Sequence, residues 1–283
     1  MTDSLRAPGR VETRHLFRPL LGELVALLRS LGEEDWERPA VGAWWVRDVV
    51  AHLTDVSARR LSYQRDGFVP PPPQEVWSDF PGLVAFLDGL NAEWVRAMRR
   101  VSPGVLTDWL AATCGEAVEV YEATDPDAPA LFPVAWAGEE RSAAWFDVGR
   151  DYTEWWHHQQ QIRAAVGEPL QTGPRWLAPV LALTVRALPR AYGEVDAAEE
   201  GTAVVLRITG LTGGIWSVVR SAGGWALWEG EAANPSARVT VDEDTAWRWL
   251  LKAMPGDDAA AKANIEGDER LGRMAFGVVA LMA

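Results

Sequence analysis

The chain has 283 residues, of which 48% are hydrophobic and 24% charged, and its formal net charge at pH 7 is −13. This length fits one large domain or two of ordinary size, and the composition is typical of a globular protein. The negative charge argues against nucleic acid and anionic membrane surfaces as partners, because both are bound through basic faces.

The hydropathy of the chain predicts where the protein is found. No segment approaches the ~20 consecutive apolar residues of a membrane-spanning helix, and residues 1–14 have no apolar signal-peptide core. We therefore expect a cytoplasmic protein.

The single cysteine, Cys114, excludes an intrachain disulfide and a Cys-cluster zinc site. It has no basic residue beside it, so we interpret it as structural rather than as a nucleophile.

The first 170 residues are predicted to be mainly helical. Residues 33–43 are expected to form a loop, and the four prolines at 70–73 an extended break. Four principal helices, one of them set off by a long connection, are typical of a four-helix bundle, and such bundles often hold metals between facing helices. Apolar residues at helical spacing predict the four principal helices over residues 11–31, 46–67, 81–101 and 142–166, and a further helical piece over residues 105–124.

After residue 170 the pattern becomes a mixture of helices and strands. Residues 174–192 predict a helix, and the β-rich runs that follow are separated as in an antiparallel meander. We therefore predict an α+β fold with two domains, residues 1–170 and 171–283. The expected strands cover residues 202–209, 214–221, 225–229, 237–241 and 263–268, and the expected helices cover residues 245–254 and 269–282.

The pair Glu154 and His158 is the strongest candidate for a functional site. Residues four apart on a helix lie on the same face, so this carboxylate and imidazole can reach one divalent metal. The chain has only four histidines, and His52 lies in a second predicted helix. Two ligands from one helix and one from another give a three-ligand site with open positions, which is the layout of a reactive metal centre.

Each candidate ligand also has an ordinary interpretation. Glu154 and His158 can form a solvated helix face, although the two tryptophans between them indicate a buried helix. A buried carboxylate needs a partner, either a metal or an arginine. His52 can be a core or surface histidine; Asp48 and Asp55 lie on the same helix face and are expected to orient its ring if it binds a metal.

The remaining histidines are expected to stay outside the site. His157 points about 100° away from His158 around the helix, so we interpret it as a bystander. His15 is expected at the surface. Asp151 shares the face of Glu154 and His158 and is a reserve ligand.

Residues 42–53, with Trp44 and Trp45, an Arg-Asp pair and then His52-Leu53, resemble the signature of the DinB-like superfamily, specifically its mycothiol-dependent maleylpyruvate isomerase branch. The last bundle helix of that family carries a Glu four residues before a His, then an Ile/Leu-Arg pair ahead of a Gly. The matching residues are Glu154, His158, Ile162, Arg163 and Gly167.

The resemblance covers about residues 11–169 and implies that His52, Glu154 and His158 hold a divalent metal. Zinc is the metal usually assigned, with nickel or another ion as alternatives. One position departs from the pattern: Gln161 stands where many members have Asp, three residues after the metal-binding His. This departure bears on the subfamily activity and leaves the three ligands in place.

The second half of the chain resembles the sterol carrier protein-like domain that follows the bundle in the same isomerases. The resemblance is carried by residues 237–241 and 265–271, which match a strand, a Gly-Asp turn and a helix. In the isomerases an arginine of this domain helps to bind the thiol. Arg207, Arg220 and Arg238 are the candidates here, and none stands out.

The function implied by this resemblance is that of a divalent-metal-dependent enzyme. It would use a low-molecular-weight thiol such as mycothiol, as an isomerase or S-transferase acting on a small electrophilic substrate. Metal-bound water or thiol would be the reacting group, and arginines near a cleft between the domains could clamp a substrate carboxylate. The alternatives are a non-catalytic metal- or small-ligand-binding protein and a regulatory protein that uses the bundle as a scaffold. The chain is expected as a monomer or homodimer.

Overall fold

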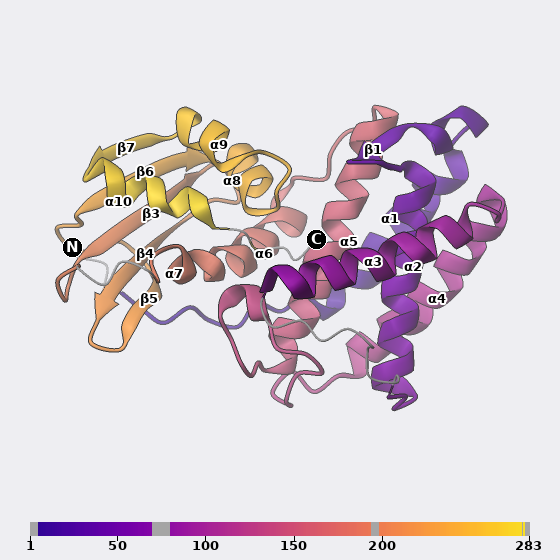
Figure 1. Ribbon diagram of the computed structural model, residues 1–283, viewed down its shortest axis with the longest axis horizontal. Helices are drawn as coiled ribbons and strands as arrows, with labels where there is room; N and C mark the ends of the chain where they lie inside the picture. Colours follow the sequence, from indigo (N-terminus) through magenta and orange to yellow (C-terminus); the bar gives the residue numbers. More distant parts are fainter. Residues whose placement is uncertain (1–4, 70–79, 194–197, 279, 281–283) are drawn as a thin grey trace. The chain divides into compact units, whose positions relative to one another are not determined.

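The computed structural model describes residues 5–69, 80–193, 198–278 and 280 (Figure 1). The chain folds into two compact units. The helical unit consists of Glu12–Leu131 and Ala143–Gln171. The sheet unit consists of the chain from Thr172 onward together with two earlier segments, the one that ends at Val11 and Phe132–Ser142. The predicted α+β class is confirmed, since one unit is built on helices and the other on a mixed sheet.

Long helices form the helical unit, as the apolar spacing predicted. α2 packs against α3, α4 and α5, and α1 packs against α4 and α5. Among the described residues, no helix is long and apolar enough to cross a membrane. The helices are α1 (Arg14–Ser30), α2 (Val46–Arg60), α3 (Phe80–Met98), α4 (Pro103–Ala123) and α5 (Ala144–Val166).

The prediction of a loop over residues 33–43 is wrong in part. Glu33–Glu37 form a 3-10 turn, and β1 (Pro39–Val41) pairs antiparallel with β2 (Trp44–Trp45). The predicted second helix is also divided, because α2 continues as a π-helical segment over Leu61–Arg65. The four prolines at 70–73 lie outside the described residues.

Both helices that carry the candidate ligands have defined ends. At the start of α2, the Trp45 N–H donates to Asp48 Oδ2 at 3.1 Å, which satisfies a backbone donor that the helix leaves open. At the end of α5, Gly167 has a φ of 79°, a left-handed conformation that glycine adopts without a steric cost. The Glu168 N–H then donates to the Arg163 carbonyl at 2.8 Å. These ends fix the register of the ligand-bearing turns.

An aromatic cluster forms the centre of the helical unit. Phe17 of α1 stacks on Tyr121 of α4, with ring centroids 4.2 Å apart. The edges of Tyr152 and Trp155 of α5 meet the Phe17 ring at centroid distances of 5.8 and 5.1 Å. Burial of such rings contributes much of the apolar stabilisation of a core, and here it holds α5 against α1 and α4.

Gln159 of α5 is an exception in this interior. Its side chain is fully buried, and neither amide atom has a hydrogen-bond partner among the described residues. An unsatisfied buried polar group costs about 1–3 kcal/mol. Gln159→Met keeps the chain length and helix propensity and removes both polar atoms. We expect it to raise the free energy of unfolding by about 1–2 kcal/mol, measured by urea denaturation; an unchanged or lower value would contradict this expectation.

The sheet unit contains a five-stranded sheet in the order β5-β4-β3-β6-β7. The predicted meander is correct for β3, β4 and β5, which pair antiparallel. It is wrong for β6, which pairs parallel to β3, while β7 pairs antiparallel to β6. The strands are β3 (Ala203–Thr209), β4 (Gly214–Ser221), β5 (Gly224–Glu229), β6 (Ala237–Asp242) and β7 (Asn264–Gly267).

Short helices pack on this sheet, with α8 against β3 and β6 and α10 against β6 and β7 (Figure 1). The helix predicted over residues 174–192 is divided, and no helix was predicted where α9 lies. The last predicted helix, residues 269–282, is shorter than expected over the described residues, because a 3-10 turn follows α10 at Ala275–Gly277; residues 279, 281 and 282 lie outside the described residues. The helices are α6 (Pro174–Thr184), α7 (Leu188–Ala191), α8 (Glu243–Leu250), α9 (Gly256–Lys262) and α10 (Glu269–Met274).

Candidate metal centre

The structure brings the three predicted ligands together inside the helical unit. His52 comes from α2, and Glu154 and His158 come from successive turns of α5. The Nε2 atoms of His52 and His158 each lie 3.0 Å from the same carboxylate oxygen, Glu154 Oε1. One ligand atom from each residue lies within 4.8 Å of the other two. The helical spacing of 154 and 158 accounts for one contact, and the packing of α2 on α5 supplies the other.

The surroundings of this triad are largely closed to solvent. The exposed fractions of His52 and His158 are 3% and 6%, and the Glu154 side chain is 19% exposed. The two imidazole rings meet edge to face at 4.8 Å, and the Trp44 ring lies 5.1 Å from the His52 ring. Burial lowers the local dielectric, which strengthens the electrostatic interactions among the three groups.

Electrostatics favour an ionised carboxylate at the centre of the triad. Burial acts to raise the pKa of Glu154, but the two imidazoles outweigh it and hold this pKa well below its usual range. Burial lowers the pKa of His52 against the opposing effect of Glu154. For His158, burial acts to lower the pKa, but Glu154 and Gln161 outweigh it and the pKa is raised. The carboxylate is therefore ionised, and its negative charge favours a cation on the His158 side of the triad.

Gln161 is a site residue whose role the sequence did not reveal. Its Oε1 accepts a hydrogen bond from His158 Nδ1 at 2.7 Å, and its Nε2 lies 3.3 Å from His157 Nε2. The only sequence signal was position, since residues three and four apart on a helix are neighbours. Because His158 Nδ1 is engaged with Gln161, Nε2 is the ring nitrogen left to act toward Glu154.

The donor set of the triad fits a divalent cation. Each 3.0 Å contact between an imidazole nitrogen and Glu154 Oε1 requires a proton or a cation between the two atoms, because a lone pair repels a carboxylate oxygen. A proton on Nε2 of His158 makes that ring an imidazolium paired with Glu154, in keeping with its raised pKa; a divalent ion between the same atoms takes the place of that proton and leaves the ring neutral. Zinc takes imidazole and carboxylate ligands at about 2.0–2.2 Å, and three protein ligands leave positions open.

The carboxylates expected to orient His52 have other partners. Asp48 pairs with Arg99 at 2.8 Å, and Asp55 pairs with Arg59 at 3.0 Å. Among the described residues, the buried Nδ1 of His52 has no hydrogen-bond partner. The expectation that Asp48 or Asp55 holds this ring is therefore wrong, and the reason is that each carboxylate is satisfied by an arginine.

Asp151, the reserve ligand, also lies outside the triad. Its Oδ2 accepts from Arg60 Nη2 at 2.6 Å and from the Tyr121 hydroxyl at 2.7 Å. The same guanidinium pairs with Asp147 at 2.8 Å, and Arg150 contacts both carboxylates. Two arginines and two carboxylates, with the Tyr121 hydroxyl, therefore form a largely buried ion network. Its carboxylates, Asp151 and Asp147, lie one and two turns before Glu154 on α5, and Asp151 is a structural partner in it.

The other sequence candidates lie where they were expected. His15 is exposed. His157 is buried, its ring stacks beside that of His158, and burial lowers its pKa to about 3. Cys114 is buried with its Sγ 3.1 Å from Ser57 Oγ, and burial raises the pKa of its thiol to about 12. A thiol held protonated at neutral pH favours a structural cysteine over a nucleophile.

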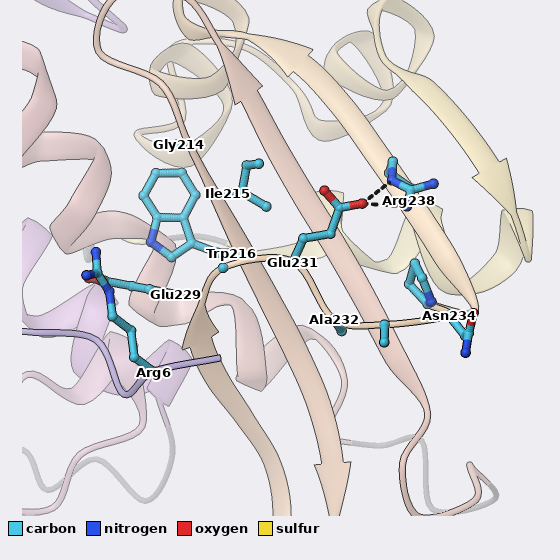
Figure 2. Close-up of a pocket in the computed structure, with 12 residues that line it drawn as sticks. Arg6, Gly214, Ile215, Trp216, Glu229, Glu231, Ala232, Asn234 and Arg238 are labelled. Atoms are coloured by element: carbon cyan, nitrogen blue, oxygen red, sulfur yellow. Dashed lines mark hydrogen bonds and ion pairs between the residues drawn. The ribbon is translucent and has the colours of Figure 1, made fainter. Parts of the chain in front are cut away.

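Two of the three candidate arginines of the sheet unit are engaged in ion pairs, and the third, Arg220, lies on β4 opposite Trp225 of β5. Arg207 and Arg238 both pair with Glu231, at 2.5 and 2.6 Å. Arg238 lines a cavity of about 660 Å³. Figure 2 shows the Glu231 carboxylate turned toward Arg238 in this lining, and Arg6 beside Glu229. Two carboxylates balance the two arginines of this lining, so the cavity carries no excess positive charge that would select an acidic ligand.

Comparison with known proteins identifies the helical unit. Residues 17–163 match the family described as the mycothiol maleylpyruvate isomerase N-terminal domain. No curated protein matches the chain. The crystal structure of the mycothiol-dependent maleylpyruvate isomerase aligns with 12% identity and a TM-score of 0.49, covering 83% of this chain and 86% of that chain. A mutant of that enzyme aligns with 12% identity, the same coverage and a TM-score of 0.48.

The family match spans more than half of the chain and includes the triad from His52 to His158. It also covers most of α1 and all of α2 to α4, together with the part of α5 that carries the ligands. The chain therefore belongs to the family of the mycothiol maleylpyruvate isomerase N-terminal domain.

Proposed function

We propose that the protein is a divalent-metal-dependent enzyme that uses a low-molecular-weight thiol such as mycothiol to isomerise a small electrophilic substrate. S-transfer to such a substrate is the second reaction that the same site would support. The family assignment supports the thiol-dependent isomerase class. The observation that carries the proposal is the convergence of two buried imidazole Nε2 atoms on one carboxylate oxygen, with ligand count and chemistry suited to a catalytic ion.

The proposal extends to the architecture. The packing of α1 and α2 against α4 and α5 supports a DinB-like four-helix bundle, in which α4 rather than the expected α3 is the fourth member. The mixed sheet with helices packed on it supports a sterol carrier protein-like domain. In sequence the two domains would cover residues 1–170 and 171–283, except that the segment ending at Val11 and Phe132–Ser142 belong to the sheet unit.

In the proposed mechanism His52, Glu154 and His158 would hold the ion. A bound divalent ion, zinc first, would supply Lewis acidity that favours the thiolate form of a thiol near pH 7. Glu154 contributes the negative charge that retains a divalent cation. The rings of Trp44 and the two histidines exclude bulk water from the donor atoms, which keeps the local dielectric low. As ligands, none of the three residues is free to act as a general base.

The test begins with the metal content of protein purified without chelator. Zinc-loaded protein is then mixed with mycothiol and either maleylpyruvate or a generic electrophile such as chlorodinitrobenzene, and isomerisation and thiol loss are followed. We expect turnover that disappears on metal removal and in His52→Ala; bacillithiol in a parallel reaction tests which thiol is used.

Two outcomes would contradict the proposed function. Metal binding with no rate above the background would favour the non-catalytic binding protein. Absence of any bound ion, both after purification and after loading, would favour a bundle that acts only as an interaction scaffold.

A further inference from the structure

Gln161 links the triad to a second buried histidine. Its amide oxygen accepts from His158 Nδ1 at 2.7 Å, and its amide nitrogen lies 3.3 Å from His157 Nε2. An amide has one accepting and one donating end, and these two contacts use both. The donor end identifies His157 Nε2 as the acceptor, and the acceptor end identifies His158 Nδ1 as the protonated nitrogen. The two contacts therefore define a single orientation of the Gln161 side chain.

This orientation determines which His158 nitrogen is available to an ion. A proton on Nδ1 leaves the lone pair of the neutral ring on Nε2, the atom 3.0 Å from Glu154 Oε1. The hydrogen bond to the second ring nitrogen of a metal-binding histidine fixes its tautomer and ring orientation. His52 has no such support, because its Nδ1 lacks a partner among the described residues. Of the two imidazoles, His158 is thus the one with a hydrogen-bonded support.

The chemical type of Gln161 also sets the charge of the site. Its amide is neutral, so Glu154 supplies the only carboxylate of the triad and its support. The other acidic side chains facing inward from α2 and α5 are neutralised by arginines: Asp48 by Arg99, Asp55 by Arg59, and Asp147 and Asp151 by Arg60 and Arg150. Two neutral imidazoles, one carboxylate and a divalent ion sum to a net charge of +1, which attracts an anionic sulfur ligand.

We propose that Gln161 is the positioning residue of this site: it holds His158 with Nε2 directed to the ion and keeps the loaded centre cationic, so that the centre prefers a thiolate. This inference rests on the proposed function, because it assigns a role to Gln161 only if the triad binds an ion. It concerns the protein's own tautomer and charge, which can be measured without turnover.

The first experiment compares the cobalt(II) affinity of four proteins. Gln161→Met removes both hydrogen bonds at nearly constant shape, and Gln161→Glu restores an acceptor that carries a charge. Gln159→Met makes the same substitution two residues away, where the amide has no partner. We expect Gln161→Met to weaken cobalt binding by about 10- to 100-fold, Gln161→Glu to bind at least as tightly as the parent, and Gln159→Met to be unchanged.

The second experiment reads the tautomer directly. In the zinc-loaded parent protein, ¹⁵N-resolved NMR should show a slowly exchanging His158 Nδ1–H. We expect this signal to persist in Gln161→Glu and to disappear through rapid exchange in Gln161→Met. A purely structural role of Gln161 would change the thermal midpoint of the metal-free protein and leave this signal in place.

The third experiment tests the charge. In cobalt-loaded protein, the thiolate charge-transfer band is titrated with mercaptoethanol. Gln161→Glu adds a negative charge near the ion, so we expect thiol binding about tenfold weaker than in the parent, although the ion is retained.

Each contrary result would overturn a different part of the proposal. Cobalt affinity of Gln161→Met within twofold of the parent, or Gln161→Glu as weak as Gln161→Met, would overturn the positioning role. Equal thiol affinity in Gln161→Glu and the parent would overturn the charge argument. A parent protein that binds no ion would overturn the proposed function and this inference together, whereas ion binding without turnover would overturn only the former.

Discussion

Glu154→Gln is expected to bind divalent ions about a thousandfold more weakly than the parent protein. Glu154 supplies the single negative charge among the three donor atoms, and both imidazole nitrogens converge on its Oε1. A unit-charge attraction at about 4 Å contributes about 4 kcal/mol at an effective dielectric of 20, and each 1.4 kcal/mol corresponds to about tenfold in affinity. Competition between the protein and a coloured chelator for zinc measures the difference.

A matched control separates this local effect from net charge. Glu119→Gln removes the same charge from an exposed position on α4 and should leave zinc affinity within about twofold, since exposed charges are screened by solvent. The metal-free Glu154→Gln protein should keep its fold, because the amide oxygen still accepts from an imidazole N–H. Zinc affinity of Glu154→Gln equal to that of the control would show that the triad does not hold the ion.

The effect extends to stability. A ligand that binds only the folded protein adds RT ln(1 + [L]/Kd) to the free energy of unfolding. At a zinc concentration about 100 times the parent Kd, this is about 2.7 kcal/mol, and a thousandfold weaker variant loses almost all of it. Parent and Glu154→Gln should therefore differ in urea midpoint with zinc and agree more closely with chelator present.

The sequence predicted correctly those features that depend on helical spacing alone. The apolar stripes placed α1, α3, α4 and α5 to within a few residues, because long helices depend on many residues that agree. The spacing of Glu154 and His158 put both on one face for the same reason. Joining His52 to them required the packing of α2 on α5, which the family resemblance implied and no local pattern contained.

The features that could not be predicted from the sequence are those in which a side chain or strand has several possible partners. Asp48 and Asp55 lie about one turn from His52, but Arg99, just after α3, and Arg59 of α2 pair with them instead, and sequence spacing cannot rank these partners. Gln161 was noted only as a departure from the family pattern, because its role depends on a rotamer that reaches two rings. The parallel pairing of β6 with β3 likewise depends on strand order, which alternation of apolar residues does not fix.

The second large effect, on the free energy of unfolding, is expected from the buried ion network whose carboxylates precede Glu154 on α5. Arg60, Asp147 and Asp151 have side-chain exposures of only 3%, 2% and 8%, and two carboxylates are balanced there by Arg60 and Arg150. Burial acts to raise the pKa of Asp151, but Arg60 and Arg150 outweigh it and the pKa is lowered. Removing one partner of such a network leaves a buried charge uncompensated, which costs about 3–5 kcal/mol.

Arg60→Met is therefore expected to lower the free energy of unfolding by about 3–5 kcal/mol at pH 7, measured by urea denaturation with chelator present. Arg60→Lys should fall between the parent and Arg60→Met, because an ammonium lacks the planar fork that binds both carboxylates. The double variant Arg60→Met/Asp151→Asn should recover about 1–2 kcal/mol, since it removes the charge left without a partner. No recovery would show that the loss comes from packing alone.

The pH dependence of the stability difference between the parent and Arg60→Met distinguishes an uncompensated charge from a loss of packing, because only the charge effect changes with pH. In the parent, the pKa of Asp151 is lower in the folded than in the unfolded protein, so its stabilisation is present above the unfolded value near 3.9 and is lost as the pH falls through the folded value. In Arg60→Met the folded pKa should instead lie above the unfolded one, so the variant gains stability relative to the parent as the carboxyl takes up a proton. The deficit should therefore shrink between pH 7 and pH 5. A constant deficit over this range would rule out an uncompensated carboxylate as its cause.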